Sequence, residues 1–490
     1  MHLSLALLLS VAVPAQSAPL PNLDFSTGKL THWEGEGFSV INEPSTDVTS
    51  ADDGRAKRTG LLHRTIVLPP NAGAVTFRAA AVRADGCEPG AALEVVLEGT
   101  ERKMAPRFVR TDKGLLAAPT LLPTLNGKPR EYVWNVEGLA GQTVRICACD
   151  LDERPGCHVV CGGFTIVARD DFNGREFGDY MLRLCRTHQL PPVTRFDSKR
   201  FMAISNAEDL FTERQLLYCE SLYDLFFDHF RRQRFVIHEP RSRLMVAVFD
   251  APAGFEAYMG QRMPNAVTGV YHPASNRLVV YDFGQNRAFK DGNERANAKL
   301  KLIPTTLEGK RIIGTFNREV REMRDDANVG TMMHEVAHQL SYNCGLLNRD
   351  GDVSLWLAEG LACYCEGTSG GSWLGVGQAN PMRAATLAAQ KRGDSPFIPL
   401  KDLVGSDNWL RRGNQGTILL GYAQSWALFR LLMEERPDAL RKYLAMIAPR
   451  RTPEHRLGDF VECFGELALL ETRYLAYIKE VVQQQVKPAK

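Results

Sequence analysis

The stretch "GTMMHEVAHQLSYN" (residues 330–343) places two histidines and a glutamate within five positions. His334 and His338 stand four residues apart, so on a helix their side chains leave from the same face. Apolar residues fill the positions around them and give the segment a face to bury. Asn343, with a glycine two residues later, is typical of a helix end. The sequence therefore predicts a helix that carries the motif His334-Glu335-x-x-His338.

This motif has the spacing of a zinc site. Two imidazoles on one face can ligate a tetrahedral zinc ion, with Glu335 beside them in reach of a bound water. The alternative is a chance match, and a third ligand would distinguish a zinc site from it. The segment "LWLAEGLACYCEG" (355–367) contains two acidic residues that could serve as this ligand. Glu359 follows the second histidine by 21 residues, enough for a loop and the first turn of a second helix, and is the expected ligand. Glu366, two helical turns later, is expected to support the ligands, as is Asn343.

The two segments together resemble the gluzincins, zinc metallopeptidases with HExxH on one helix and a glutamate on the next. "W-L-A-E-G-L-A" (356–362) is similar to their aminopeptidase-type motif. The resemblance is closer still to a bacterial exported family of unknown function with a peptidase-MA-like core, and it covers about 200–480. That family shares "H-E-x-x-H-Q-L", an Asn-x-Gly turn, a "W-L-x-E-G-L-A" motif and a later "Y-A-Q-S-W", here 422–426. Ser354 and Cys365 depart from its pattern without removing a ligand.

The resemblance implies a reaction. Zinc activates a water that attacks the peptide carbonyl, and Glu335 acts as general base. Tyr422 corresponds to the tyrosine that stabilises the oxyanion in aminopeptidase-type gluzincins, although a tyrosine that only packs between helices is an equal alternative. In such folds an edge strand, expected here within 268–282, holds an extended peptide. The sequence lacks the "G-x-M-E-N" motif of true aminopeptidases, which favours an endopeptidase.

Upstream of these motifs, residues 22–168 consist of short alternating or apolar segments between Gly-, Pro- and Asn-rich turns. This pattern predicts an all-β sandwich or jelly roll. "LDFSTGKLTHWEGEGFSV" near its start and "VWNVEGLAGQTVRICACD" near its end resemble galactose-binding-like jelly rolls. Trp33 could stack on a sugar ring, but a tryptophan that fills the sandwich core is the favoured alternative.

The rest of the chain fits a second domain. Polar and proline-marked residues 169–198 are expected to form a linker with a short helix. Strands at 201–206, 243–250 and 268–283, a long amphipathic helix at 207–233 and a mostly helical remainder predict an α+β domain over 199–484. The fold expected for the chain is thus multidomain, a jelly-roll sandwich followed by a gluzincin-like metallopeptidase domain.

The N-terminus and the cysteines suggest export. Residues 1–18 have the apolar core and small-residue end of a signal peptide, although a buried strand is the alternative. The 11 cysteines suit an oxidising compartment, and their odd number leaves at least one outside any intramolecular disulfide. Four of them cluster at 147–161, where disulfides or buried thiols are favoured over a structural zinc site. The protein is therefore expected to be secreted or periplasmic.

Charge and length limit the partners. Lys plus Arg (59) nearly balance Asp plus Glu (57), which gives no electrostatic argument for nucleic acid or an anionic membrane. No later stretch is long and apolar enough for a membrane span. The leading hypothesis is an exported zinc metallopeptidase that cleaves peptides or proteins, with a sandwich that targets carbohydrate or the cell envelope. The alternative is a catalytically inactive gluzincin-fold protein that binds or acts as an envelope scaffold.

Overall fold

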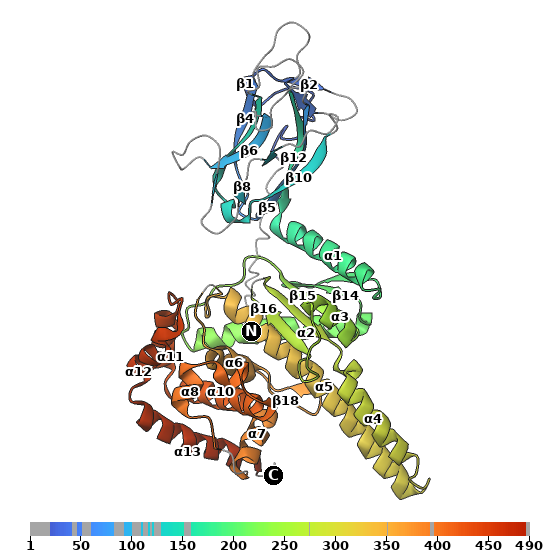
Figure 1. Cartoon of the computed structure of the whole chain (residues 1–490), viewed down its shortest axis with the longest axis vertical. Coiled ribbons are helices and arrows are strands. Elements are labelled where there is room, and N and C mark those ends of the chain that lie inside the picture. Colours follow the sequence, from blue (N-terminus) through green and yellow to red (C-terminus); the bar gives the residue numbers. More distant parts are fainter. Residues whose placement is uncertain are drawn as a thin grey trace, which may run out of the picture. The chain divides into compact units, whose positions relative to one another are not determined.

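The computed structural model of the chain forms two compact units, Met1–Glu176 and Phe177–Lys490 (Figure 1). The described residues are 20–41, 47–50, 60–82, 93–99, 109–110, 116–117, 120–121, 129–150, 158–273, 275–349, 351–392 and 396–486. The expected signal peptide and Cys157 lie outside them. Within these ranges no helix combines the length and hydropathy that a membrane crossing needs.

The N-terminal unit is a β-sandwich, as the alternating segments predicted. One five-stranded antiparallel sheet has the order β1-β4-β11-β6-β9 and the other β10-β5-β12-β3-β2, with a two-stranded ribbon β7-β8 beside them. The strands are β1 (Glu34–Glu36), β2 (Ser39–Ile41), β3 (Asp47–Thr49), β4 (Gly60–Val67), β5 (Ala72–Val82), β6 (Leu93–Gly99), β7 (Val109–Arg110), β8 (Leu116–Ala117), β9 (Thr120–Leu121), β10 (Arg130–Asn135), β11 (Thr143–Asp150) and β12 (His158–Ala168). A 3-10 turn, η1 (Glu137–Leu139), precedes β11.

Aromatic side chains fill the space between the two sheets. Residues along β4 alternate between buried and outward positions, as expected for a strand with one face on a core. Phe77 stacks on Phe164 with ring centroids 5.2 Å apart. Trp33 is only 7% exposed, stacks on Phe25 at 4.6 Å and donates its indole N–H to the carbonyl of Asn22. Trp33 is therefore a core residue, the alternative that the sequence favoured, and its buried ring is not placed to stack on a sugar.

Several cysteines of the described ranges carry free thiols. Cys463 is half-buried, and the others are buried: Cys161, Cys185, Cys219, Cys344, Cys363 and Cys365. A buried thiol behaves as a small apolar side chain. Of the cluster at 147–161, Cys161 is thus a buried thiol, one of the two alternatives favoured there.

The segment 169–198 is not a linker. It begins with a 19-residue helix, α1 (Arg169–Thr187), and ends with a strand, β13 (Thr194–Asp197), which pairs with the sheet of the C-terminal unit. Phe177 and Met181 of α1 are fully buried in that unit's core. A short helix was expected here, but not its full length or its packing on the sheet, because its apolar positions are sparse among many charged residues.

The C-terminal unit is built on a mixed sheet of order β13-β14-β15-β17-β16. The three middle strands are parallel and the two edge strands antiparallel. The strands after β13 are β14 (Phe201–Ser205), β15 (Leu244–Phe249), β16 (Gly269–His272) and β17 (Arg277–Tyr281). Helices α1 and α3 (Pro252–Met259) pack on one face, and α2 (Asp209–Arg232) and α5 (Leu307–Asn343) on the other. Strands and helix were predicted within a few residues of these bounds.

Beyond the sheet the unit is mostly helical, as predicted. A 3-10 turn η2 (Phe283–Gln285) and helix α4 (Arg287–Leu300) precede α5. The elements that follow are α6 (Leu355–Cys365), β18 (Thr368–Ser369), β19 (Ser372–Trp373), α7 (Pro381–Arg392), α8 (Leu400–Gly405), α9 (Asn408–Arg411), α10 (Gln415–Glu435), α11 (Pro437–Ile447), η3 (Pro453–His455), α12 (Arg456–Phe464) and α13 (Leu467–Val486). Their apolar faces share one core with the sheet, so α5 lies between the sheet and the helical part.

Candidate metal centre

The end of α5 carries the histidine motif. Apolar residues from Val329 to Leu340 are buried against the sheet and α6, so the helix is held on most of its faces. The last residue of the helix is Asn343, and Gly345 follows with a φ of 91°, a conformation that glycine adopts easily. The stop signals in the sequence were therefore correct.

The edge strand β16 lies directly against α5 at the glutamate of the motif. A Cβ on Gly269 would stand 2.5 Å from Thr331 Cγ2 and 3.0 Å from Glu335 Cγ, so only glycine allows this approach. Two residues later, the backbone N–H of Tyr271 donates to Glu335 Oε2 at 2.6 Å. The outward edge of the sheet thus faces Glu335 and fixes one of its oxygens.

Helix α6 presents Glu359 to the histidines. All its residues from Trp356 onward are buried. A Cβ on Gly360 would meet the carbonyl oxygen of Ser425 at 2.6 Å, so this glycine lets α6 and α10 cross in close contact. The neighbouring Glu359 and, on α10, Tyr422 are thereby brought to the same place as the motif of α5.

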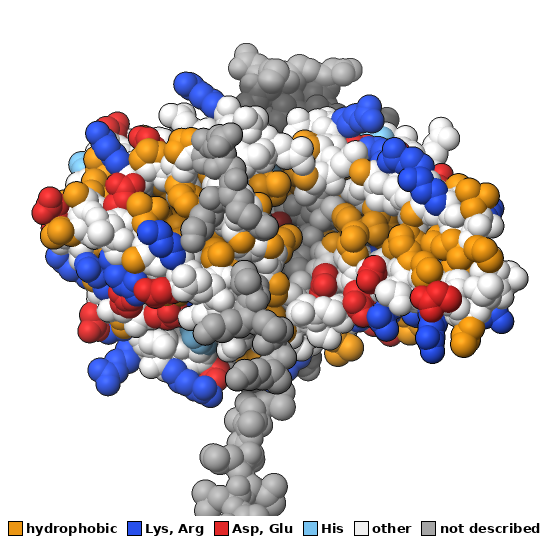
Figure 2. Space-filling view, turned by 90° about the horizontal axis from the view of Figure 1, so that it is seen from below, with side chains coloured by type: hydrophobic (Ala, Val, Ile, Leu, Met, Phe, Trp, Pro, Cys, Tyr) orange, Lys and Arg blue, Asp and Glu red, His pale blue; other side chains and the backbone are white. Residues whose placement is uncertain are grey.

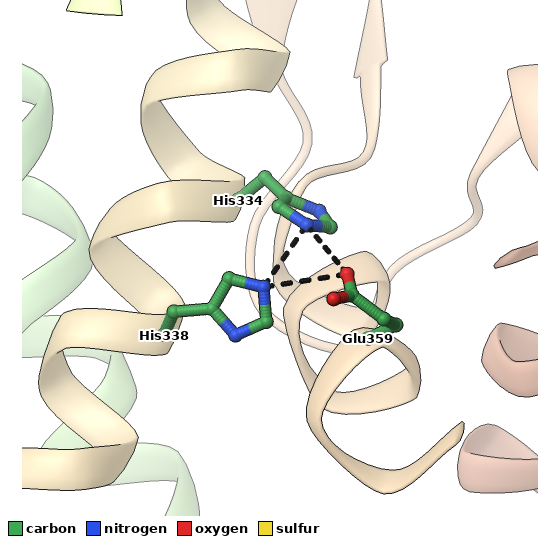
Figure 3. Close-up of side chains that lie close together, drawn as sticks. All are labelled: His334, His338 and Glu359. Atoms are coloured by element: carbon green, nitrogen blue, oxygen red, sulfur yellow. Dashed lines mark hydrogen bonds and ion pairs between the residues drawn. The ribbon is translucent and has the colours of Figure 1, made fainter. Parts of the chain in front are cut away.

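The three expected ligand atoms converge from two helices (Figure 3). His334 Nε2 lies 3.0 Å from Glu359 Oε2, His338 Nε2 lies 3.2 Å from His334 Nε2, and His338 Nε2 lies 3.3 Å from Glu359 Oε2. Ligand bonds to tetrahedral zinc of about 2.0–2.1 Å imply ligand atoms about 3.3–3.4 Å apart. The group is a candidate metal site whose triangle matches one face of such a tetrahedron, with the fourth corner left for a water.

The other ring nitrogen of His334 is held by Glu366. Nδ1 lies 2.6 Å from Glu366 Oε2, which is the arrangement that orients a metal-ligating histidine. Arg383 of α7 binds the same carboxylate through Nε at 2.6 Å and an Nη at 3.2 Å. Asn380, which caps α7, donates to Glu366 Oε1 at 2.9 Å.

A second potential metal group includes the other nitrogen of His334 with Cys363 and Glu366. The Arg383 guanidinium already supplies the positive charge there, and the Glu366 oxygens are occupied by hydrogen bonds. A cation added at this point would meet Arg383 at close range. The triangle with Glu359 is therefore the better metal site, and Glu366 supports it.

The pKa shifts of the three acidic residues agree with Glu359 as a ligand and Glu366 as its support. Burial by itself would raise the pKa of Glu359, but His338 and His334 hold it well below its usual range. Burial likewise acts to raise the pKa of Glu366, and Arg383 and His334 outweigh it. Both carboxylates are thus anions. Burial raises the pKa of Glu335 above its usual value, a shift that the two histidines only partly offset.

Tyr422, which the family resemblance suggested, lies beside the candidate ligands. Its ring centroid is 6.0 Å from that of His334, and the Arg383 guanidinium lies 5.1 Å from the centre of the same ring. Burial and the charge of Glu359 raise its pKa well above the usual value, so the phenol keeps its proton. Tyr422 is therefore available as a hydrogen-bond donor.

Asn343 does not support the ligands as expected. Its side-chain amide donates to Asn276 Oδ1 at 2.6 Å and to the carbonyl of Gln339 at 2.7 Å. Asn276 lies in the turn between β16 and β17 and also accepts from the Tyr271 hydroxyl. Asn343 thus ties the β16–β17 hairpin to the end of α5, one turn beyond the motif.

Sequence reasoning missed several residues of the site: Gly269, Tyr271, Asn380 and Arg383. Each acts through a contact with a residue that is distant in the sequence, and none stands in a local motif. A weak signal existed for Asn380, because Asn before Pro381 is typical of a helix start.

A family model described as "Protein of unknown function (DUF1570)" matches residues 328–454, which hold the three candidate metal ligands, Glu366, Arg383 and Tyr422. This agrees with the expected resemblance to a family of unknown function. No curated protein matches the sequence.

Solved structures match at low identity. TmCBM61 in complex with β-1,4-galactotriose is 16% identical, with 30% of this chain and 97% of that chain covered and a TM-score of 0.21. The K3 cleaved adhesin domain of Lys-gingipain from Porphyromonas gingivalis W83 is 15% identical, with 31% and 99% covered and a TM-score of 0.20. The IMPa metallopeptidase from Pseudomonas aeruginosa is 10% identical, with 91% and 54% covered and a TM-score of 0.22. The chain thus shares weak likeness with carbohydrate-binding modules and a metallopeptidase, and the case for a metal centre rests on its own geometry.

Proposed function

We propose that the protein is a zinc-dependent metallopeptidase of the gluzincin type. The observation that carries the proposal is the triangle of His334 Nε2, His338 Nε2 and Glu359 Oε2, with sides of 3.0–3.3 Å. Two imidazoles and one carboxylate are a ligand set of catalytic zinc, in which the fourth position stays open. When bound there, zinc supplies the Lewis acidity that makes a water nucleophilic at neutral pH and polarises a carbonyl.

Glu335 is the general base in this proposal. The Tyr271 N–H engages Oε2, which leaves Oε1 to take the proton from the attacking water and pass it to the leaving amine. Burial of Glu335 and its raised pKa favour a carboxylate that both accepts and releases a proton. The close contact at Gly269 holds the base in place relative to the edge strand.

Tyr422 is the donor to the developing oxyanion. Its protonated phenol comes from α10, and its ring lies beside that of His334. A donor placed in a buried site before the reaction stabilises the charge that forms in the transition state. The Arg383 guanidinium packs over the face of the same ring, 5.1 Å from its centre.

An extended peptide is the proposed substrate. The peptide groups of β16 on the side of Glu335 belong to an edge strand, with β17 on the other side. A peptide can add to such an edge by backbone hydrogen bonds, which suits internal cleavage of a polypeptide. Export to a secreted or periplasmic location, and a carbohydrate- or envelope-binding role for the sandwich, complete the proposal.

The decisive experiment replaces Glu335 by Gln in the full chain. We expect zinc content, measured by mass spectrometry, to stay near one per chain, while hydrolysis of a broad peptide library falls about a hundred- to ten-thousand-fold. The matched control is Glu319→Gln, the same change on an exposed turn of the same helix. It should retain full activity.

Two results would change the proposal. Equal cleavage rates for the wild type and Glu335→Gln would remove Glu335 as the base. If both proteins hold zinc and neither cleaves any peptide, the protein is the inactive binding or scaffold protein instead. Chelation should abolish wild-type hydrolysis, and added zinc should restore it.

A further inference from the structure

Helix α4 and the first half of α5 form a hairpin that leads away from the other elements of the C-terminal unit (Figure 1). No residue of α4 is buried. In α5 the only buried residue before Val329 is Gly309. A hairpin that buries so little contributes almost nothing to the core, so its length calls for another explanation.

The turn at the end of the hairpin has a well-defined conformation. The Thr306 hydroxyl accepts the backbone N–H of Gly309 and so caps α5. A Cβ on Gly309 would lie 2.0 Å from the carbonyl oxygen of Pro304, so the turn closes only because this residue is glycine. The turn therefore presents its side chains on a fixed support.

Apolar side chains are exposed at this tip, which we define as residues 299–312. Leu302 is 83% exposed, Leu307 71% and Ile312 46%. Figure 2, which views the molecule from below, shows hydrophobic side chains across the lobe on the right, where Figure 1 has the hairpin. Single exposed leucines are common on protein surfaces, but three within a short projecting tip indicate a contact surface.

The tip is also basic. Its charged residues are Lys299, Lys301, Lys310 and Arg311 against the single acid Glu308, a net of +3. The hairpin from 287 to 324 has ten basic and five acidic residues, a net of +5, whereas the whole chain has only +2. Positive charge is therefore concentrated here in a protein that is nearly neutral.

We propose that this tip docks on an anionic lipid surface. Lysines and arginines around exposed leucines have the chemistry that such a surface binds: the cations meet the headgroups and the apolar side chains enter the acyl boundary. The complementarity of charge favours this occupant over a second copy of the chain, because two tips of equal charge repel each other.

The docking would fix the position of the metal centre. From Leu307 to His334 the chain is one continuous helix, and at about 1.5 Å per residue the centre lies about 40 Å from the tip. A substrate cleaved by the docked protein would therefore have to extend that far from the lipid. This consequence rests on the proposed function, but the docking itself does not.

The test is sedimentation of the full chain with vesicles of phosphatidylcholine alone or with phosphatidylglycerol. We expect binding only to the anionic vesicles, with a strong loss as salt is raised. Lys301→Glu with Lys310→Glu should lower the partition coefficient about tenfold or more, and so should Leu302→Ser with Leu307→Ser. The matched control is Val236→Ser, at a 96% exposed residue outside the hairpin; it should bind as the wild type does.

Zinc content and thermal unfolding of each variant establish that it is folded, since none of these residues touches the core. Absence of binding to anionic vesicles would overturn the proposal. Loss of self-association in Leu302→Ser with Leu307→Ser, observed by analytical ultracentrifugation without any vesicle binding by the wild type, would make the tip a protein–protein contact instead. Activity on soluble peptides should be the same in all variants, so this result is independent of the peptidase proposal.

Discussion

The two halves of α5 share one helix and differ in almost everything else. From Leu307 to 328 only one residue is buried, whereas from Val329 to Ser341 nearly all are, including both histidines and the glutamate of the motif. Sheet, α2 and α6 enclose the second half. The contrast teaches that a helix alone does not make a site. The motif can bind a metal only where other elements add a third ligand, hold the histidines by hydrogen bonds and bury the group from solvent.

The same contrast determines how charges behave. In the exposed half, ion pairs such as Arg318–Glu322 are solvated and contribute little to stability. In the buried half, each ionisable side chain has a specific partner, as in His334 with Glu359 and Glu366. Substitutions should therefore have large effects in one half and small effects in the other.

The largest effect is expected for Glu359→Ala. Structural zinc in zinc-finger peptides is bound by four ligands with a free energy of about 10–16 kcal/mol, or about 3–4 kcal/mol for each ligand. Loss of one ligand should therefore reduce zinc affinity by a few hundredfold. Competition with a chromophoric chelator measures it. Unchanged affinity in this variant would mean that the buried half of α5 holds no metal with α6.

A smaller loss is expected for Glu366→Gln. The amide keeps the shape, but it attracts the His334 N–H and Arg383 less strongly. Support of this kind typically contributes about ten- to a hundredfold in metal affinity. The same titration provides the measurement, and a loss greater than that of Glu359→Ala would show that the two acids have the opposite roles.

A pair of glycines compares the surroundings of the two halves directly. Gly269→Ala should destabilise the fold by about 1–3 kcal/mol, because its Cβ would overlap Thr331 and press on Glu335. Gly314→Ala, in the exposed half with nothing near its Cβ, should stabilise it by about 0.5–1 kcal/mol. Urea unfolding measures both, and effects of the same sign would contradict the packing of β16 on α5.

The smallest effect is expected for Met323→Gln. This side chain is 58% exposed on the outer half of α5, so the free energy of unfolding should change by less than about 0.5 kcal/mol. Zinc affinity should not change. A loss above 1 kcal/mol in urea unfolding would indicate that the exposed half packs against something after all.

Much of the candidate site could be predicted because its spacing is local. His334, Glu335 and His338 follow from a four-residue period, and Glu359 from its place on the next helix. Tyr422 came from a family resemblance, and the structure places its ring near His334. Local patterns also predicted the sandwich, the central strands and a short helix within 169–198. They did not predict that α1 is long and packs on the sheet through Phe177 and Met181.

The overall composition did not predict the concentration of positive charge at the hairpin tip. A net charge of +2 over the chain gives no reason to expect an anionic partner, and the basic residues of the tip are spread over two helices and a turn. Folding brings Lys299 and Lys301 to the same end of the molecule as Lys310 and Arg311, because α4 and α5 run back along each other. The net charge of the whole chain carries no information about that arrangement.

The sequence by itself determined the helix that holds the motif, the residue types that suit zinc and the β character of the first unit, because periodicity and ligand spacing act over a few residues. Only the tertiary structure decided that Arg383 and Asn380 hold Glu366, that Asn343 binds Asn276 instead of supporting the ligands, and that Tyr271 holds Glu335. These outcomes depend on which distant backbones approach one another. Such approaches are set by the packing of whole elements, and no local pattern specifies them.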